Sequence, residues 1–170
     1  ETGQLQNDRL RIAVAAKGAE LRSLVDLRSG REWMWQGSPD FWPRTSPVLF
    51  PVVGKLAGNE LRHEGVKYPL SQHGFARDRQ FQLVNHDASQ IRFRLESDSE
   101  TLKMYPFGFI LEISYQLTEN QLLVNYRVEN PGKEELPFSI GAHPGFSLHG
   151  WPAKKFVLQF ERENVMNVFH

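Results

Sequence analysis

Two of the six histidines, His73 and His143, stand in sequence surroundings that suit chemistry. Each lies in an apolar, glycine-rich segment, Ser71–Asp78 for the first and Gly141–Phe146 for the second. A glycine one or two residues downstream lets the backbone turn sharply or approach a ligand closely. Histidine titrates near neutral pH, so it can donate or accept a proton in a reaction. Two partly buried histidines, hydrogen-bonded at strand ends, are the structural alternative, and the pattern alone leaves both interpretations open.

Other kinds of site have less support. The chain contains no cysteine, which excludes a disulfide scaffold, thiol catalysis and cysteine-ligated zinc. His73 and His143 lie far apart in sequence with no carboxylate at a fixed spacing, so they do not form a metal-ligand set. Gly54-Lys55 lacks the preceding glycine and the following Ser or Thr of a phosphate-binding loop. We therefore expect no metal and no cofactor.

Basic and aromatic side chains accompany the two histidine segments. Arg44 and Arg77 each present a planar fork of donors that suits sugar hydroxyls, carboxylates or phosphates, although surface charge is the simpler interpretation for most of the 20 basic residues. Four aromatic residues precede the first histidine and could belong to the core or line a sugar pocket, because apolar sugar faces stack on aromatic rings: Trp33, Trp35, Phe41 and Trp42.

The elements that must position these residues are β-strands, since period-two alternation of apolar and polar residues dominates the chain. It is clearest in Ile91–Glu96, Phe109–Leu117 and Leu122–Val128, and it is typical of half-buried antiparallel strands. Further strands are expected at Leu10–Val14, Glu20–Leu27, Glu32–Gln36, Val66–Leu70, Phe81–Asn85 and Phe156–Phe160. Helix is expected only as a short turn at Ser38–Trp42. The sequence thus predicts an all-β antiparallel β-sandwich, formed as a single domain over residues 1–170.

Two long stretches, Phe41–Asp78 and Pro137–Gly150, interrupt the alternation. Irregular segments carried by a β scaffold are where binding and catalytic residues concentrate. Both histidines of interest lie in these stretches. We therefore predict that His73, Arg77 and His143 converge on one concave surface.

Composition narrows the choice of partner and compartment. Lysine plus arginine and aspartate plus glutamate number 20 each, so the formal net charge is zero, which argues against nucleic acid as a partner. No apolar run approaches the length needed to cross a bilayer. The absence of cysteine and of a signal peptide favours a cytoplasmic location.

Four motifs occur in one order and together resemble the aldose 1-epimerase (galactose mutarotase-like) family, especially its bacterial branch. They are Trp35–Gly37, Phe41–Lys55, Gln72–Asp78 and Pro137–Phe146. The resemblance covers nearly the whole chain. It implies a large antiparallel β-sandwich that binds a sugar in an open cleft, and an isomerase that interconverts the α and β anomers of a hexose. It implies a sugar as partner, with or without a phosphate, and a homodimer as a candidate assembly.

The resemblance also implies roles for individual residues. His143 matches the general acid that protonates the ring oxygen. His73 matches a second histidine, which hydrogen-bonds the sugar and stabilises charge on that oxygen. Arg44, Gln72 and Arg77 match positions that hold the substrate in the sugar-phosphate branch of the family.

One departure from the family pattern leaves the function open. The family's general base is a glutamate near the end of a longer chain, and the setting of Glu161 and Glu163 does not resemble that motif. We therefore expect these 170 residues to be the N-terminal part of a family member, inactive alone and with a sandwich incomplete at its C-terminus. A non-catalytic carbohydrate-binding module and a structural half-domain that pairs with another chain are the alternatives.

Overall fold

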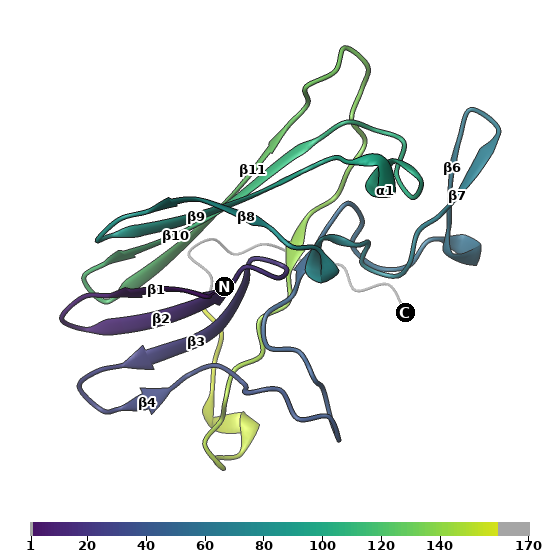
Figure 1. Ribbon diagram of the computed structural model, residues 1–170. Coiled ribbons are helices and arrows are strands. Elements are labelled where there is room, and N and C mark those ends of the chain that lie inside the picture. Colours follow the sequence, from purple (N-terminus) through teal and green to yellow (C-terminus); the bar gives the residue numbers. More distant parts are fainter. Residues whose placement is uncertain (1, 160–170) are drawn as a thin grey trace.

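The chain forms two four-stranded antiparallel sheets that face each other, shown in Figure 1. The computed structural model describes residues 2–159. The first sheet has the order β1-β2-β3-β4 and the second the order β11-β10-β9-β8. Their strands are β1 (Thr2–Gln6), β2 (Leu10–Ala15), β3 (Glu20–Asp26), β4 (Arg31–Glu32), β8 (Gln82–His86), β9 (Gln90–Glu96), β10 (Ile110–Thr118) and β11 (Gln121–Glu129). The predicted all-β class with antiparallel pairing is confirmed.

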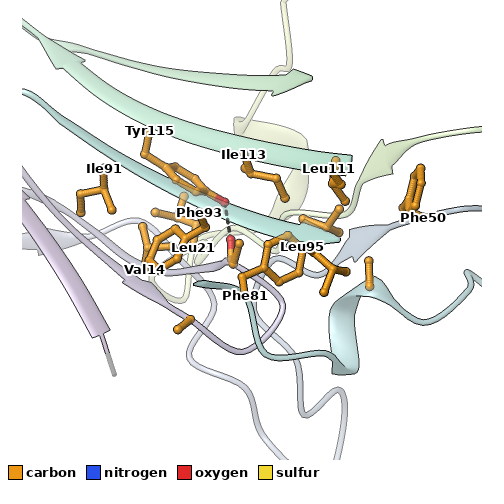
Figure 2. Close-up of a cluster of buried hydrophobic side chains, with 14 of the residues drawn as sticks. Val14, Leu21, Phe50, Phe81, Ile91, Phe93, Leu95, Leu111, Ile113 and Tyr115 are labelled. Atoms are coloured by element: carbon orange, nitrogen blue, oxygen red, sulfur yellow. Dashed lines mark hydrogen bonds between the residues drawn. The ribbon is translucent and has the colours of Figure 1, made fainter. Parts of the chain in front are cut away.

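The core lies between these sheets and is built from the alternation seen in the sequence. In the second sheet, Phe93 of β9 is opposite Ile113 of β10, and both are buried. In the first sheet, Leu5 of β1 is opposite Ile12 of β2, again with both buried. Figure 2 shows the cluster, including the phenol of Tyr115, whose hydroxyl donates to the carbonyl of Ala19 over 2.7 Å. This bond ties the second sheet to the turn that leads into β3.

Two smaller pairings lie outside the sandwich. The strands β5 (Val48–Leu49) and β12 (Gly141–Ala142) pair antiparallel, and β6 (Glu60–His63) and β7 (Val66–Pro69) form a hairpin that projects from the rest in Figure 1. The only α-helix among the described residues is one turn, α1 (Ser99–Leu102), and three 3₁₀ turns cover Ala57–Asn59, Ala76–Asp78 and Ala153–Lys155. No helix within residues 2–159 is long and apolar enough to cross a membrane.

Several sequence-based expectations about the elements need correction. The strand expected at Glu32–Gln36 forms only at its first residue, since β4 ends at Glu32. The strand expected at Phe156–Phe160 does not form over residues 156–159, and Phe160 lies outside the described residues. Val157 and Leu158 are 86% and 74% exposed there, so the alternation has no described sheet to pack against. Conversely, β1 and β6 form although we expected no strand at either place. The expected turn at Ser38–Trp42 is present, closed by the N–H of Phe41 donating to the carbonyl of Ser38.

Candidate functional site

The short strand β5 brings the two histidine segments together from opposite sides. Phe50 bridges Gly74 in parallel, next to His73, while Val48 pairs with Ala142, next to His143. On the His73 side, the carbonyl of Phe50 accepts from the backbone N–H groups of Phe75 and Ala76. On the other side, the carbonyl of Pro51 accepts from the N–H of Ser139. The chain around β5 therefore lies between two segments that are 70 residues apart in the sequence and brings them together.

The position of His73 depends on an unusual backbone. His73 and Gly74 both have positive φ, at 66° and 67°, a conformation that costs a non-glycine residue about 1 kcal/mol or more. A Cβ added to Gly74 would lie 2.3 Å from the carbonyl oxygen of Phe50. The second residue must therefore be glycine for the segment to approach β5. This arrangement turns the imidazole of His73 back toward Gly54.

Gly54 fixes the tautomer of His73. Its N–H donates to Nδ1 of the imidazole over 3.0 Å, and its carbonyl accepts from the backbone N–H of His73 over 2.8 Å. Because Nδ1 accepts, the proton of the neutral ring must lie on Nε2. The side-chain nitrogen Nε2 of Gln72 lies 3.3 Å from that nitrogen. Because both nitrogens carry N–H groups in this tautomer, they do not hydrogen-bond to each other. His73 therefore presents an N–H donor next to an amide that can also bind a polar ligand.

The surroundings of His73 keep the ring neutral. Partial burial lowers its pKa below the ordinary value of 6.5, and the positive charges of Arg77 and His143 lower it further. A protonated Nδ1 would also lose the hydrogen bond from Gly54. At neutral pH, His73 is consequently a hydrogen-bond donor without charge.

His143 is held differently. Its backbone N–H donates to the carbonyl of Pro47 over 3.1 Å, which extends the pairing of β12 with β5. Its imidazole is exposed and packs against the indole of Trp42, with ring centroids 4.8 Å apart and an interplanar angle of 38°. Within residues 2–159, no hydrogen bond holds the ring. Both of its nitrogens are thus available for proton transfer.

The two arginines form a cluster with Asp78. Arg44 donates from Nη2 to Oδ1 of Asp78 over 2.9 Å, and Arg77 donates from Nη2 to the carbonyl of Gln72 over 2.8 Å. The Nε of Arg77 is buried with no hydrogen-bond partner among the described residues. Burial lowers the pKa of Arg77 and the charge of Arg44 adds to this, while Asp78 opposes both. Two guanidinium groups share one carboxylate, so the cluster keeps a net positive charge.

Beside the cluster, a groove of about 390 Å³ runs along β2 and β3. Its lining consists of Ala15, Lys17, Glu20, Arg22, Pro43, Arg44, Arg77 and Asp78, and neither histidine contributes to it. Of the three residues predicted to share a concave surface, Arg77 alone lines this groove. The predicted roles of these residues remain predictions.

Sequence reasoning overlooked Glu20. Its carboxylate is buried, and Oε1 accepts from the backbone N–H groups of Thr45 and Ser46 over 2.8 Å each. The other oxygen lies 3.1 Å from Nη1 of Arg22. Glu20 thus anchors the segment that carries Arg44. It stands at the start of an ordinary strand pattern, so nothing in the sequence distinguishes it from a solvent-exposed acid.

The comparisons with known proteins decide the family. The sequence pattern of the aldose 1-epimerase family matches residues 1–163. The chain belongs to the aldose 1-epimerase family. Protein LacX (plasmid) of Lactococcus lactis subsp. lactis is 30% identical to it over 168 residues, which cover 94% of this chain and 56% of LacX.

Solved structures agree with this membership of the aldose 1-epimerase family. A galactose mutarotase related enzyme from Lactobacillus acidophilus superposes with a TM-score of 0.86 at 38% identity, over 89% of this chain and 52% of that one. A galactose mutarotase-like protein from Lactobacillus casei ATCC 334 superposes with a TM-score of 0.85 at 38% identity, over 91% of this chain and 52% of that one. The chain thus spans about half the length of the relatives that it matches.

Proposed function

We propose that the protein containing this chain interconverts the α and β anomers of a hexose by acid–base catalysis. The observation that carries the proposal is that the chain around β5 pairs with two segments whose histidines are held differently. One is a neutral Nε2–H donor and the other is exposed with both nitrogens available. Membership of the aldose 1-epimerase family supports the same reaction class.

The reaction requires two proton transfers. His143 gives a proton to the ring oxygen as the bond between C1 and that oxygen breaks, while a base removes the proton of the C1 hydroxyl and C1 becomes a carbonyl carbon. Rotation about the C1–C2 bond and reversal of both transfers then closes the ring on the other face. The Nε2–H of His73 hydrogen-bonds the ring oxygen and stabilises the negative charge that develops there.

Arg44, Gln72 and Arg77 hold the sugar in this proposal. The fork of a guanidinium suits either a pair of neighbouring hydroxyls or a phosphate, so a neutral hexose and a hexose phosphate are both candidate substrates. Within residues 2–159, no carboxylate hydrogen-bonds to either imidazole, and Glu161 and Glu163 lie outside the described residues. We therefore assign no residue to the role of base.

The experiment is magnetisation-exchange NMR on equilibrated sugars with the full-length gene product. Exchange between the α and β H1 resonances of galactose, glucose or their 6-phosphates, faster than in buffer, supports the enzyme and identifies the substrate. The rival proposal, a non-catalytic carbohydrate-binding module, predicts shifted or broadened sugar resonances without added exchange. If no sugar shows either added exchange or shifted or broadened resonances, both proposals are contradicted.

A further inference from the structure

We propose that Trp42 is a positioning residue for His143, and that Gly145 is glycine so that the two rings can meet. The inference rests on the proposed function and adds to it the device that orients the acid. Its basis is the contact between the indole and the imidazole, whose centroids are 4.8 Å apart. No other side chain within residues 2–159 stacks on the His143 ring or hydrogen-bonds to it.

Trp42 is itself fixed to the segment that carries His143. The Nε1–H of Trp35 donates to the carbonyl of Trp42 over 2.8 Å, and the backbone N–H of Trp35 donates to the carbonyl of Gly145 over 2.9 Å. The N–H of Gly145 in turn donates to the carbonyl of Thr45 over 2.8 Å. The backbone of Trp42 and the segment that carries His143 are therefore joined through Trp35.

Gly145 provides the space for this packing. A Cβ at this position would lie 2.8 Å from Cζ3 of Trp42 and 3.0 Å from Cβ of Trp35, closer than real carbon atoms approach. The φ angle of Gly145 is not positive, so its backbone conformation does not require glycine. Close approach of Trp42, with Trp35 next to it, is the remaining reason for a residue without a side chain.

Packing by a ring face suits an acid that must reach a substrate. The indole restricts rotation of the imidazole without using a hydrogen bond, so both ring nitrogens remain available. A catalytic group held in its productive orientation needs no reorganisation during the reaction, and misplacement by about 1 Å can cost roughly 100-fold in rate. The expected consequence is a Trp42 effect on kcat rather than on substrate affinity.

The test compares Trp42→Leu, Trp42→Phe and Gly145→Ala in the full-length protein. The first readout is the ring-current shift of the His143 imidazole protons, assigned by their loss in His143→Gln. The second is kcat and KM for the hexose whose anomers the wild type exchanges. Trp151→Leu is the matched control, because the Trp151 ring centroid lies 4.3 Å from Nζ of Lys155 and this tryptophan has no proposed role.

We expect Trp42→Leu to remove the ring-current shift and to lower kcat by about 10- to 100-fold, with KM changed less than about threefold. Trp42→Phe should keep most of the ring-current shift and most of kcat. Gly145→Ala retains the indole and the imidazole but displaces the indole, so it should resemble Trp42→Leu. If Trp42→Leu does not fold, the other two variants decide. An unchanged kcat in an active protein would overturn the positioning role alone, as would an unchanged shift. A wild type without activity would instead overturn the proposed function and this inference with it.

Discussion

The N–H of Gly54 and Nδ1 of His73 form a 3.0 Å hydrogen bond that decides which nitrogen of the imidazole carries its proton. The reciprocal bond, from the N–H of His73 to the carbonyl of Gly54, closes the pair. Gly54 follows β5 and His73 lies on the loop before η2 (Ala76–Asp78). The tautomer of His73 is therefore set by a backbone N–H group. A substitution at Gly54 that leaves the backbone in place would not change it.

This relationship predicts a pH dependence. The pKa of His73 is lowered by burial, then by Arg77 and His143, so the folded state binds its proton less readily than the unfolded state. The stability that this residue contributes is present above pH 6.5 and is lost as the pH falls from there toward the folded pKa. Nitrogen-detected NMR of the histidine rings should show the Nε2–H tautomer at pH 7 and a midpoint below 6.5. An Nδ1–H tautomer, or a midpoint at or above 6.5, would contradict the assignment.

Gly74→Ala should be strongly destabilising. The added Cβ would lie 2.3 Å from the Phe50 carbonyl oxygen and 2.6 Å from its carbon, so the His73 loop must separate from β5. We expect a loss of more than about 3 kcal/mol in the free energy of unfolding, measured by urea denaturation. Gly30→Ala is the matched control, because Gly30 has a similar φ of 68° with nothing within 4 Å, and it should cost about 1 kcal/mol. Equal losses in the two variants would show that steric contact at Gly74 contributes nothing.

Removing the carboxylate of Glu20 should loosen the Arg44 segment. In Glu20→Ala the N–H groups of Thr45 and Ser46 lose their acceptor in a buried place, which we expect to cost about 2–4 kcal/mol. Glu20→Gln keeps one acceptor oxygen and should cost less. Thermal unfolding gives the comparison, and hydrogen exchange at Thr45 and Ser46 localises the effect. Similar stability in both variants, with unchanged exchange, would argue against the anchoring role.

The sequence predicted those strands whose alternation is long enough to mark a buried face. Ile91, Phe93 and Leu95 face the core as expected, and so do the alternate residues of β10. β1 lacked such a pattern, since Gly3 fills an inward place that would otherwise carry a side chain, with Ile91 3.0 Å from a Cβ added there. β6 pairs only with β7 and has a single apolar residue, Leu61, which is too few for an alternation to be visible. The run at Phe156–Phe160 alternates yet forms no strand over residues 156–159. Alternation shows that a segment could form a half-buried strand, but a strand also needs a neighbouring strand with which to pair.

The site was predictable as a set of residue types and not as a set of contacts. The glycine-rich surroundings of His73 and His143 marked both segments. The partners that give each ring its character, the backbone of Gly54 and the indole of Trp42, depend on tertiary pairing around β5. A backbone donor leaves no trace in the side-chain sequence, and Trp42 looked as suitable for the core as for a pocket.

Arg77→Ala should act on affinity. Its guanidinium is held by the Gln72 carbonyl, and its Nε has no hydrogen-bond partner among the described residues. A group that binds the sugar equally in ground and transition states changes KM rather than kcat. We expect KM to rise about 10-fold or more with kcat within about threefold, since a hydrogen bond from a charged donor contributes roughly 1.5–3 kcal/mol. Arg62→Ala, on the projecting hairpin, is the control and should change neither. A fall in kcat alone would instead assign Arg77 to the chemical step.

The most direct test of the proposed acid is polarimetry on a freshly dissolved α-hexose with the full-length protein and its His143→Ala variant. Relaxation of the optical rotation follows interconversion of the anomers as it occurs. The wild type should accelerate it, and His143→Ala should lower kcat by about 10²- to 10⁴-fold, because the ring oxygen would lose its proton donor. A wild type no faster than buffer, or a variant that keeps the wild-type kcat, would contradict the account.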